Sequence, residues 1–425
     1  MSRPRAAVLL TGNELVRGVI GDRNGCHLAE NLEQIGFAVR RLLTVGDGVE
    51  EIAAGLAELV PVHDLVVTSG GLGPTHDDRT VEAVARVAGV PLEVDRAVLE
   101  TVTRWTDEVA ERFGYDPARF AAGNLKQAHI PAGASVLGIA GTAPGLILNV
   151  AGAIVVVLPG VPSELRRLWA AAPDHPLMRA LVGRAQPRSR FLLRTYGIGE
   201  SHVADLFAAA GSDPEGVETS ICARSYEIEV DVRALPGAEQ AGADLADRLA
   251  RSLGEHVFSR DRRTVAELVL DRARAAGLTV ATAESCTAGM VASMLTDVPG
   301  SSDVVAGGVV AYADAVKTGL LGVDPALLER HGAVSAEAAA AMAAGVRERL
   351  GAGVGVAVTG IAGPGGATPG KSVGLVFLHV SAPGGEFCRR LDATGGRAEI
   401  RARAATAALH LLRTSLAISP APVRT

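Results

Sequence analysis

Short aliphatic runs alternate with helical stripes along most of this chain, and that alternation restricts the folds it can adopt. Residues 6–10 form a continuous apolar run, and Leu28, Leu32 and Ile35 follow at the spacing of one helix face. A continuous run of this kind is typical of a parallel strand that is buried on both faces. Because strands that alternate with helices assemble into parallel sheets, we predict an α/β protein.

The 425 residues are enough for two or three domains. Residues 1–170 and 261–425 each show the α/β alternation, whereas residues 171–260 combine an alternating strand pattern with a helical one. We therefore predict two α/β domains joined by a small α+β module. The most apolar stretch, residues 146–161, contains prolines and glycines, so it is predicted as a buried strand with flanking turns and not as a membrane span.

Composition argues against several classes of protein. The formal net charge of −6 gives no overall attraction for nucleic acid or an anionic membrane. The four cysteines are scattered without metal-ligand spacing, and a disulfide framework is not expected in a chain of this length. The first apolar run is too short for the core of a signal peptide. We expect a cytoplasmic protein with reduced thiols.

A candidate nucleophile lies in the last third of the chain. Residues 278–282 show a strand pattern, and apolar residues recur at helical spacing from Met290. Ser285 therefore falls on a predicted strand-to-helix turn, beside the N–H groups of a first helical turn, which can stabilise an oxyanion. A serine needs a base, and Lys317 is a candidate if folding buries it, because burial disfavours a charged amine. Spacing alone favours a plainer role for Ser285 as a helix cap.

Three loops of the first predicted domain follow strands and carry glycines and carboxylates. They span residues 11–14, 45–47 and 68–78. Glycines let backbone N–H groups approach a phosphate closely, and ligands of open α/β sheets bind at this edge. The acids are predicted to hold a divalent cation that bridges phosphate oxygens. For the adjacent acid pair alone, the alternative is a favourable position at a helix N-terminus. The residues concerned are Gly70, Gly71, Gly73, Asp47, Asp77 and Asp78.

Five motifs occur in order in the last third, at residues 284–287, 299–302, 312–317, 331–335 and 359–364. They resemble the C-terminal domain of the competence/damage-inducible protein A (CinA) family, which is similar to bacterial nicotinamide-nucleotide amidases. The resemblance implies that this domain hydrolyses the carboxamide of nicotinamide mononucleotide without a cofactor.

In that reading Ser285 attacks, Lys317 is the base, and Tyr312 orients or relays the proton. Arg397 and Arg401 on the last predicted helix are candidates for a phosphate contact, with solvated helix charges as an equal alternative. The residues expected to bind substrate are Thr287, Ser301, Ser302, Thr359, Gly360 and Arg397.

The sequence departs from the family pattern at three positions. Ala288 stands where glycine is common, Asp314 where asparagine is common, and Ser372 where proline is frequent. None of these removes the serine, tyrosine or lysine. Ala288 is expected to narrow the approach of the backbone to a ligand.

The first domain resembles the molybdopterin-binding fold of molybdenum cofactor biosynthesis proteins, as found at the N-terminus of CinA. Residues 22–24, 45–47 and 70–78 carry the likeness. In CinA this domain is associated with metal-dependent ADP-ribose pyrophosphatase activity. The resemblance implies that Asn24 and the three acids line a site for an ADP-ribose-like dinucleotide. The alternative is a domain that only binds a pterin-like or nucleotide ligand, in a chain with a regulatory role.

CinA relatives carry a KH-like module at residues 171–260. KH modules clamp nucleic acid through a GXXG loop. Residues 197–199, Gly-Ile-Gly, lack that spacing, and no cluster of basic and aromatic residues compensates. We therefore predict a spacer or dimerisation module, a homodimer, and no nucleic-acid or membrane partner.

Overall fold

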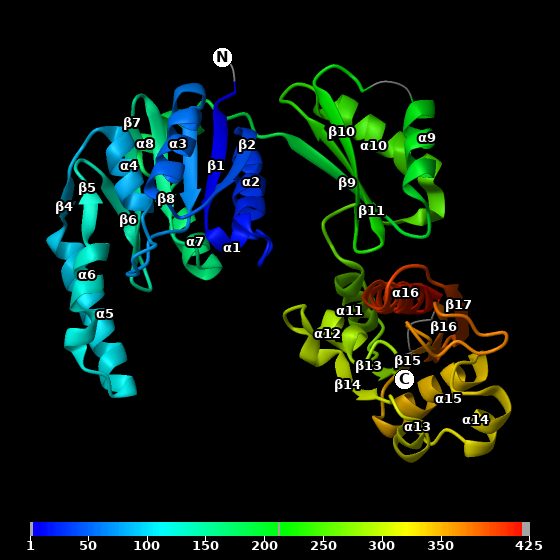
Figure 1. Cartoon of the computed structure of the whole chain (residues 1–425). Coiled ribbons are helices and arrows are strands. Elements are labelled where there is room, and N and C mark those ends of the chain that lie inside the picture. The colour runs from blue at the N-terminus through cyan, green and yellow to red at the C-terminus, as the bar shows by residue number, and fades with distance from the viewer. Residues whose placement is uncertain (1–2, 211–212, 419–425) are drawn as a thin grey trace. The chain divides into compact units, whose positions relative to one another are not determined.

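The computed structural model describes residues 3–210 and 213–418. Its internal contacts divide the chain into two compact units, which are Met1–Ser189 with Leu235–Gly237, and Arg190–Ala234 with Ala238–Thr425 (Figure 1). Within the described ranges, no helix is both long enough and apolar enough to cross a membrane.

Six strands form the sheet of the first unit, in the order β2-β1-β3-β8-β7-β6. The first four are parallel, as predicted, whereas β7 and β6 pair in antiparallel fashion. The stretch 146–161, predicted as a single strand, belongs to β7 and β8, which are joined by a turn at Ala151 and Gly152, both at positive φ. The sheet is therefore mixed. Its strands are β1 (Arg5–Thr11), β2 (Ala38–Val45), β3 (Leu65–Ser69), β6 (Ser135–Ala140), β7 (Ala143–Val150) and β8 (Ala153–Leu158).

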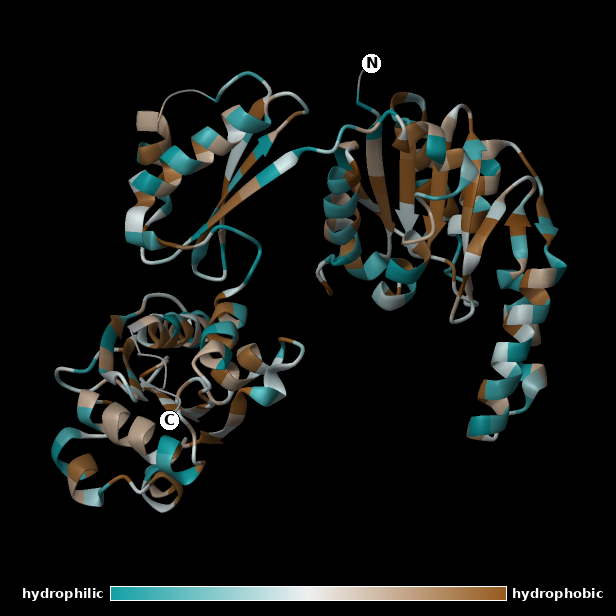
Figure 2. Ribbon diagram, turned by 180° about the vertical axis from the view of Figure 1, so that it is seen from behind, coloured by the Kyte–Doolittle hydropathy of each residue, from teal (hydrophilic) through white to brown (hydrophobic). Residues whose placement is uncertain are grey.

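Helices cover both faces of this sheet, which explains why β1 is continuously apolar. Ala6, Val8 and Leu10 join the hydrophobic cluster that contains α2, α7 and α8, and Ala7 and Leu9 join the cluster that contains α3 and α4. The strands are accordingly brown along most of their length in Figure 2. The helices are α1 (Asn13–Val16), α2 (Asn24–Ile35), α3 (Val49–Leu59), α4 (Thr80–Ala88), α7 (Pro162–Trp169) and α8 (Pro176–Val182), with a 3-10 turn at Val60–Val62.

A helical arm extends from a short antiparallel strand pair beside this sheet. The strands are β4 (Leu92–Val94) and β5 (His129–Pro131). Between them the chain forms α5 (Arg96–Phe113), a 3-10 turn (Pro117–Phe120) and α6 (Ala121–Gln127). Asp95 caps α5 by accepting the N–H of Val98.

The second unit begins with a four-stranded sheet in the order β10-β11-β9-β12, with antiparallel pairing between β10 and β11 and between β9 and β12. The predicted α+β module is thus present as an antiparallel sheet with two helices. Its elements are β9 (Ser189–Thr195), α9 (Glu200–Ala210), β10 (Val217–Arg224), β11 (Glu227–Ala234), α10 (Glu239–Leu253), a 3-10 turn (Gly254–His256) and β12 (Val257–Ser259).

The remaining sheet has the order β14-β13-β15-β16-β17. The strands β14, β13 and β15 are parallel, whereas β16 and β17 are antiparallel. Helices α11, α12 and α16 contribute to the core on one face, and α13 and α15 to the core on the other. The strands are β13 (Val280–Glu284), β14 (Val305–Val310), β15 (Val354–Gly360), β16 (Leu375–Ala382) and β17 (Gly385–Asp392). The helices are α11 (Val265–Ala275), α12 (Met290–Thr296), α13 (Asp314–Leu321), α14 (Pro325–His331), α15 (Ala336–Arg349) and α16 (Arg397–Ile418), with a 3-10 turn at Ser301–Asp303.

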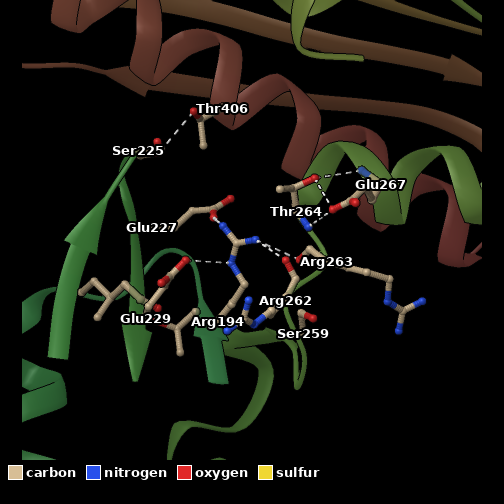
Figure 3. Close-up of polar contacts among 12 residues, drawn as sticks. Arg194, Ser225, Glu227, Glu229, Ser259, Arg262, Arg263, Thr264, Glu267 and Thr406 are labelled. Atoms are coloured by element: carbon tan, nitrogen blue, oxygen red, sulfur yellow. Dashed lines mark hydrogen bonds and ion pairs between the residues drawn. The ribbon is translucent and has the colours of Figure 1, made fainter. Parts of the chain in front are cut away.

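A buried polar joint ties the antiparallel module to α16 and to the chain before α11 (Figure 3). Arg194 is paired with Glu227 at 2.8 Å and with Glu229 at 3.4 Å, and it also donates to the carbonyl oxygens of residues 262 and 263. His410 of α16 lies 2.8 Å from Glu227 and stacks on Tyr196 with the ring centroids 3.7 Å apart. These contacts pair the buried charges of Arg194 and Glu227 inside the second unit, while the Nδ1 atom of His410 has no hydrogen-bond partner among the described residues.

Candidate active sites

Three motifs that are far apart in the sequence meet at one edge of the C-terminal sheet. Glu284, the last residue of β13, pairs with Val310 of β14 and Val358 of β15, so the carboxyl ends of these parallel strands coincide. Ser285 follows β13 directly, and its N–H donates to the Val358 oxygen at 2.9 Å. Tyr312 follows β14 and is 58% exposed. The register of the sheet therefore brings Ser285 and Tyr312 to the same edge.

Lys317 of α13 turns back to this edge and is only 1% exposed. Its Nζ donates to the backbone oxygen of Tyr312 at 3.3 Å and lies 3.0 Å from a carboxylate oxygen of Asp314. The amine is thus buried, as the sequence-based hypothesis required. The Lys317 amine therefore has the Asp314 carboxylate and the Tyr312 carbonyl as its two hydrogen-bond partners.

The expectation that the first turn of α12 stabilises an oxyanion is wrong. The buried carboxylate of Glu284 accepts the N–H groups of Gly289 at 2.9 Å, Val291 at 3.1 Å and Ala292 at 2.9 Å. The helix begins only at Met290, well beyond Ser285. Its N-terminus is therefore occupied by a charge from the protein itself, and Ser285 does not cap it.

Cys286, beside Ser285, is not a competing nucleophile. Burial raises the pKa of its thiol to about 11. Because the thiolate is the reactive form of cysteine, this side chain is essentially unreactive at neutral pH. The hydroxyl of Ser285, which is only partly buried, is the better candidate.

Arg397, at the start of α16, contacts the candidate tyrosine. One nitrogen of its guanidinium donates to the Tyr312 hydroxyl at 2.8 Å, and the other donates to the Gly363 oxygen at 2.7 Å. Arg401, one turn later, contacts the backbone of the Ser285 turn, donating to the oxygens of Cys286 and Thr287, both at 2.9 Å. Both arginines therefore lie at the candidate site, with Arg397 exposed to solvent and Arg401 partly buried.

Thr359 and Gly360 have structural contacts at the end of β15. The Thr359 hydroxyl is buried and donates to the Ala333 oxygen at 2.7 Å. A Cβ at Gly360 would lie 2.6 Å from the Val376 side chain, so glycine lets β16 approach. These contacts account for both residues without a ligand.

Ser301 and Ser302 lie at the opposite edge of the sheet from Ser285. They form the 3-10 turn that precedes β14, whose first residue pairs with Val280 at the start of β13. The five residues of β13 separate the two edges by about 16 Å. Within one chain, the structure does not bring these two serines together with Ser285.

The three loops of the first unit converge as predicted. A cavity of about 400 Å³ lies at this edge, and Gly70, Gly71 and Gly73 are among the residues that line it. Gly70 and Gly71 have φ values of 112° and 67°, and a Cβ on either would meet atoms of Thr11 or Thr80 within 2.6 Å. The close packing of this loop against its neighbours therefore requires glycine.

Asp47, Asp77 and Asp78 all line that cavity. The hydroxyl of Thr75 bonds to both Asp77 and Asp78, and this hydrogen bond lowers the pKa of Asp77. Burial raises the pKa of Asp47, and the negative charges of Glu14, Asp77 and Asp78 raise it further. The carboxylates of this cavity therefore repel one another, while Lys126 partly offsets their charge at Asp77.

Asn24 lies in an adjoining cavity of about 470 Å³, which shares Thr11, Glu14 and Gly160 with the first. Its amide nitrogen donates to the Ser69 hydroxyl at 3.0 Å and to the Gly160 oxygen at 2.7 Å. The candidate residues of the first unit therefore form one continuous lining, with carboxylates in one cavity and an amide in the next.

Comparison with known proteins assigns both ends of the chain. A family model described as "CinA C-terminal domain" matches residues 262–416, and one described as "Probable molybdopterin binding domain" matches residues 7–176. Over 422 residues the sequence is 44% identical to a CinA-like protein of Mycobacterium marinum, which covers 97% of this chain and 98% of that protein. The chain belongs to the CinA-like protein family. The resemblance stated from the motifs is confirmed.

Other CinA-like relatives agree. One from Mycobacterium tuberculosis is 43% identical over 426 residues, which is 98% of each chain. Among solved structures, the protein CinA from Thermoplasma acidophilum, described as of unknown function, is 36% identical and covers 40% of this chain and 97% of its own, with a TM-score of 0.36.

Several polar residues of this CinA-like chain were missed in the sequence. Glu14, Gln127, Thr142 and Glu164 line the cavity of the first unit, and burial raises the pKa of Glu164. Glu164 belongs to the run 159–164, which is similar to a CinA family motif but can equally be a turn before a helix, so the sequence did not assign it to the site. Glu14 belongs to the loop of residues 11–14 that the sequence analysis named, but it was not predicted as a site residue.

The carboxylates of this CinA-like fold do not form a ready-made metal cage. Among the residues that the structure describes, no three His, Cys, Asp or Glu side chains converge on one point. A Mg²⁺-like ion usually takes one or two carboxylates and keeps its other positions for water and substrate phosphates. Asp77 and Asp78, joined through Thr75, fit that mode, with Asp47 facing them.

Proposed function

We propose that the C-terminal domain is a serine amidase that converts nicotinamide mononucleotide to nicotinate mononucleotide and ammonia. The observation that carries the proposal is the convergence of Ser285, Tyr312 and a buried Lys317 at one sheet edge. A serine becomes nucleophilic when an adjacent base accepts its proton, and a buried amine is such a base in its neutral form.

In the proposed reaction, the Ser285 oxygen attacks the carboxamide carbon while its proton passes to the Lys317 amine. The tetrahedral intermediate collapses when the protonated lysine returns a proton to the amide nitrogen, which leaves as ammonia. Water then hydrolyses the acyl-enzyme ester, again with the lysine as base, and releases the carboxylate and Ser285. Since the Tyr312 oxygen accepts a hydrogen bond from Arg397, its own O–H remains free to orient the substrate or relay a proton.

The test is deamidation by Ser285→Ala, measured as ammonia release from nicotinamide mononucleotide. We expect activity to fall to background. The matched control is Ser293→Ala, an exposed serine on α12. Wild-type turnover by the Ser285 variant, or loss of turnover in the control, would contradict the assignment.

For the first domain we propose a metal-dependent pyrophosphatase that acts on an ADP-ribose-like dinucleotide. The glycine-rich loop and the facing carboxylates support this, because N–H groups and a cation together neutralise a pyrophosphate. Asp77 and Asp78 would hold the cation, which when bound would polarise phosphate oxygens, and Asn24 would orient the ligand in the adjoining cavity. A domain that only binds its ligand is the alternative.

Release of AMP from ADP-ribose, with and without Mg²⁺, separates these two functions. We expect Mg²⁺-dependent release that is lost in Asp78→Asn and kept in Asp107→Asn, an exposed acid on α5. Ligand binding without release in the wild type would favour the binding role.

We propose further that the middle module acts as a spacer and dimerisation element in a homodimer. Its buried joint with α16 supports the spacer role, because it fixes the module to the amidase domain. Sedimentation of the full chain would measure the dimer.

A further inference from the structure

A further cavity of the first unit, of about 410 Å³, adjoins the one that Asp47, Asp77 and Asp78 line, which we call the carboxylate cavity. Its walls come from the glycine-rich loop, α4, β4 and α6. The two cavities share part of their lining, namely Gly71, Leu72, Gly73, Asp78 and Gln127. The glycine-rich loop is therefore a wall common to both cavities, and one ligand can extend across it.

The walls away from this loop are largely aliphatic. They include Val81 of α4, Leu92 of β4, Leu125 of α6 and Pro144 of β7. Leu92 and Leu125 are 36% and 44% exposed, so apolar surface of both side chains faces solvent. Ligand pockets are typically concave and mostly apolar, and the burial of apolar surface favours binding. These walls therefore suit a ring with apolar faces.

The charged side chains away from the loop already have protein partners. Glu82 pairs with Arg79 at 3.0 Å, and the Lys126 amine donates to the backbone oxygen of Thr75. Neither side chain is therefore free to bind a phosphate in this cavity. The phosphates of a ligand belong on the other side of the glycine-rich loop, in the carboxylate cavity.

His129 supplies an unpaired polar group among the aliphatic walls. Its Nδ1 atom lies 2.7 Å from the Leu125 oxygen, and because a carbonyl oxygen only accepts, that nitrogen carries the hydrogen. In the neutral imidazole Nε2 is then an acceptor, and it has no partner within residues 3–210 and 213–418. The cavity thus offers an acceptor to a ring that carries an N–H group at its edge.

We infer that this cavity is the subsite for the base of the nucleotide that the first domain binds, and that an amino-bearing base such as adenine packs against its aliphatic walls. The inference rests on the proposed function of that domain and deepens it. The phosphates lie across the glycine-rich loop, where N–H groups and a cation neutralise them. The Asn24 cavity, which also adjoins the carboxylate cavity, then receives the second ribose of an ADP-ribose-like ligand.

The first test is the binding of AMP to the full chain with Mg²⁺, measured by titration calorimetry. Leu125→Asn replaces part of an aliphatic wall by an amide, and we expect the dissociation constant for AMP to rise roughly tenfold. Ribose 5-phosphate carries no base and should bind this variant and the wild type equally. An unchanged affinity for AMP, or equal weakening of both ligands, would overturn the inference.

The matched control is Leu42→Asn. Leu42 of β2 is 46% exposed and lines none of the three cavities. We expect this variant to bind AMP within about twofold of the wild type, because a surface leucine away from the ligand does not contribute to binding. A loss of AMP affinity as large as that of Leu125→Asn would count against the subsite.

The second test fills the cavity. Ala122 of α6 lines it and is exposed, so Ala122→Phe adds a ring there without repacking the core. We expect AMP affinity to fall by about tenfold or more, and KM for ADP-ribose to rise with little change in kcat. This variant also decides the matter should Leu125→Asn not fold.

AMP binding needs no hydrolysis, so the base subsite and the pyrophosphatase activity can fail separately. If the variants weaken AMP binding as expected while the wild type releases no AMP from ADP-ribose, the catalytic proposal fails and the base subsite stands. If the wild type cleaves ADP-ribose but Ala122→Phe leaves AMP affinity and KM unchanged, the base subsite fails and the catalytic proposal stands.

Discussion

The two candidate sites of this CinA-like chain differ in how their charges are held. At the Ser285 turn, Glu284 and Lys317 are buried and each is bonded to protein groups. In the first unit, Asp77 and Asp78 are exposed and bond to Thr75 of their own loop. The first arrangement is preorganised, and the second is completed by what it binds. Substitutions at the first site should therefore change both stability and rate, whereas those at the second should change ligand response alone.

The largest effect should come from Lys317→Met, which keeps the length of the buried side chain and removes the base. General-base catalysis contributes up to about 10⁴-fold, and we expect deamidation to fall roughly 1,000-fold. Ammonia release measures it, and circular dichroism checks the fold. Retention of more than a tenth of the activity would mean that another group takes the serine proton.

Next comes the pH dependence of the second unit. Burial lowers the pKa of His410 from 6.5 to about 4, although the nearby Glu227 carboxylate opposes this. Above pH 6.5 the imidazole of His410 is neutral in both the folded and the unfolded chain. Between pH 6.5 and 4 it binds a proton only in the unfolded chain. Stability should therefore be complete above pH 6.5 and fall by roughly 3 kcal/mol towards pH 4. Urea unfolding at several pH values measures this, and His410→Gln, which cannot titrate, should remove that part of the slope.

A smaller loss is expected for Glu284→Gln. The amide keeps the shape but replaces a charged acceptor of three N–H groups, at a cost of about 2 kcal/mol in unfolding free energy. The counterpart in the exposed site, Glu14→Gln, should change stability by less than about 0.5 kcal/mol. Equal losses in the two variants would erase the distinction between the sites.

The smallest effect should be that of Asp47→Asn. Burial and neighbouring charges raise the pKa of Asp47 in the folded chain. Once the pH exceeds the ordinary pKa of an aspartate, ionisation of Asp47 therefore lowers the free energy of unfolding. The amide should therefore be neutral or slightly stabilising, by up to about 0.5 kcal/mol, at pH 7. Melting of the first unit with added Mg²⁺ tests the site, since the stabilisation by Mg²⁺ should shrink in the variant. An unchanged Mg²⁺ response would remove Asp47 from the cation site.

The sequence predicted which helices and strands are present better than it predicted where each one begins and ends. Short runs of consecutive apolar residues predicted β1 and β13. Such runs arise because both strands are buried on two faces. The same signal merged β7 and β8, since both are apolar and the turn between them has Ala151, a residue that rarely adopts a positive φ, beside Gly152.

Site prediction had a similar limit. The motif around Ser285 was found, yet the role of Glu284 was not, because a carboxylate that binds N–H groups of the next helix looks like any acid beside a serine. Arg401 illustrates the same point. Its contacts with Cys286 and Thr287 join residues more than a hundred positions apart, which spacing cannot reveal.

Helix α16 bears on where the C-terminal domain begins as a folding unit. Arg401 on this helix donates to the backbone of the turn that carries Ser285, while Thr406 and His410 contact Ser225 and Glu227 of the antiparallel module. Arg401 and His410 are only about 13 Å apart along the helix axis. Cutting the chain at residue 262, where the family match begins, would remove Tyr196 and Glu227, the aromatic and acidic partners of His410, and would expose that side chain. The smallest C-terminal fragment that melts as a single cooperative body should consequently start near residue 190, upstream of the residue at which the match to the C-terminal family model begins.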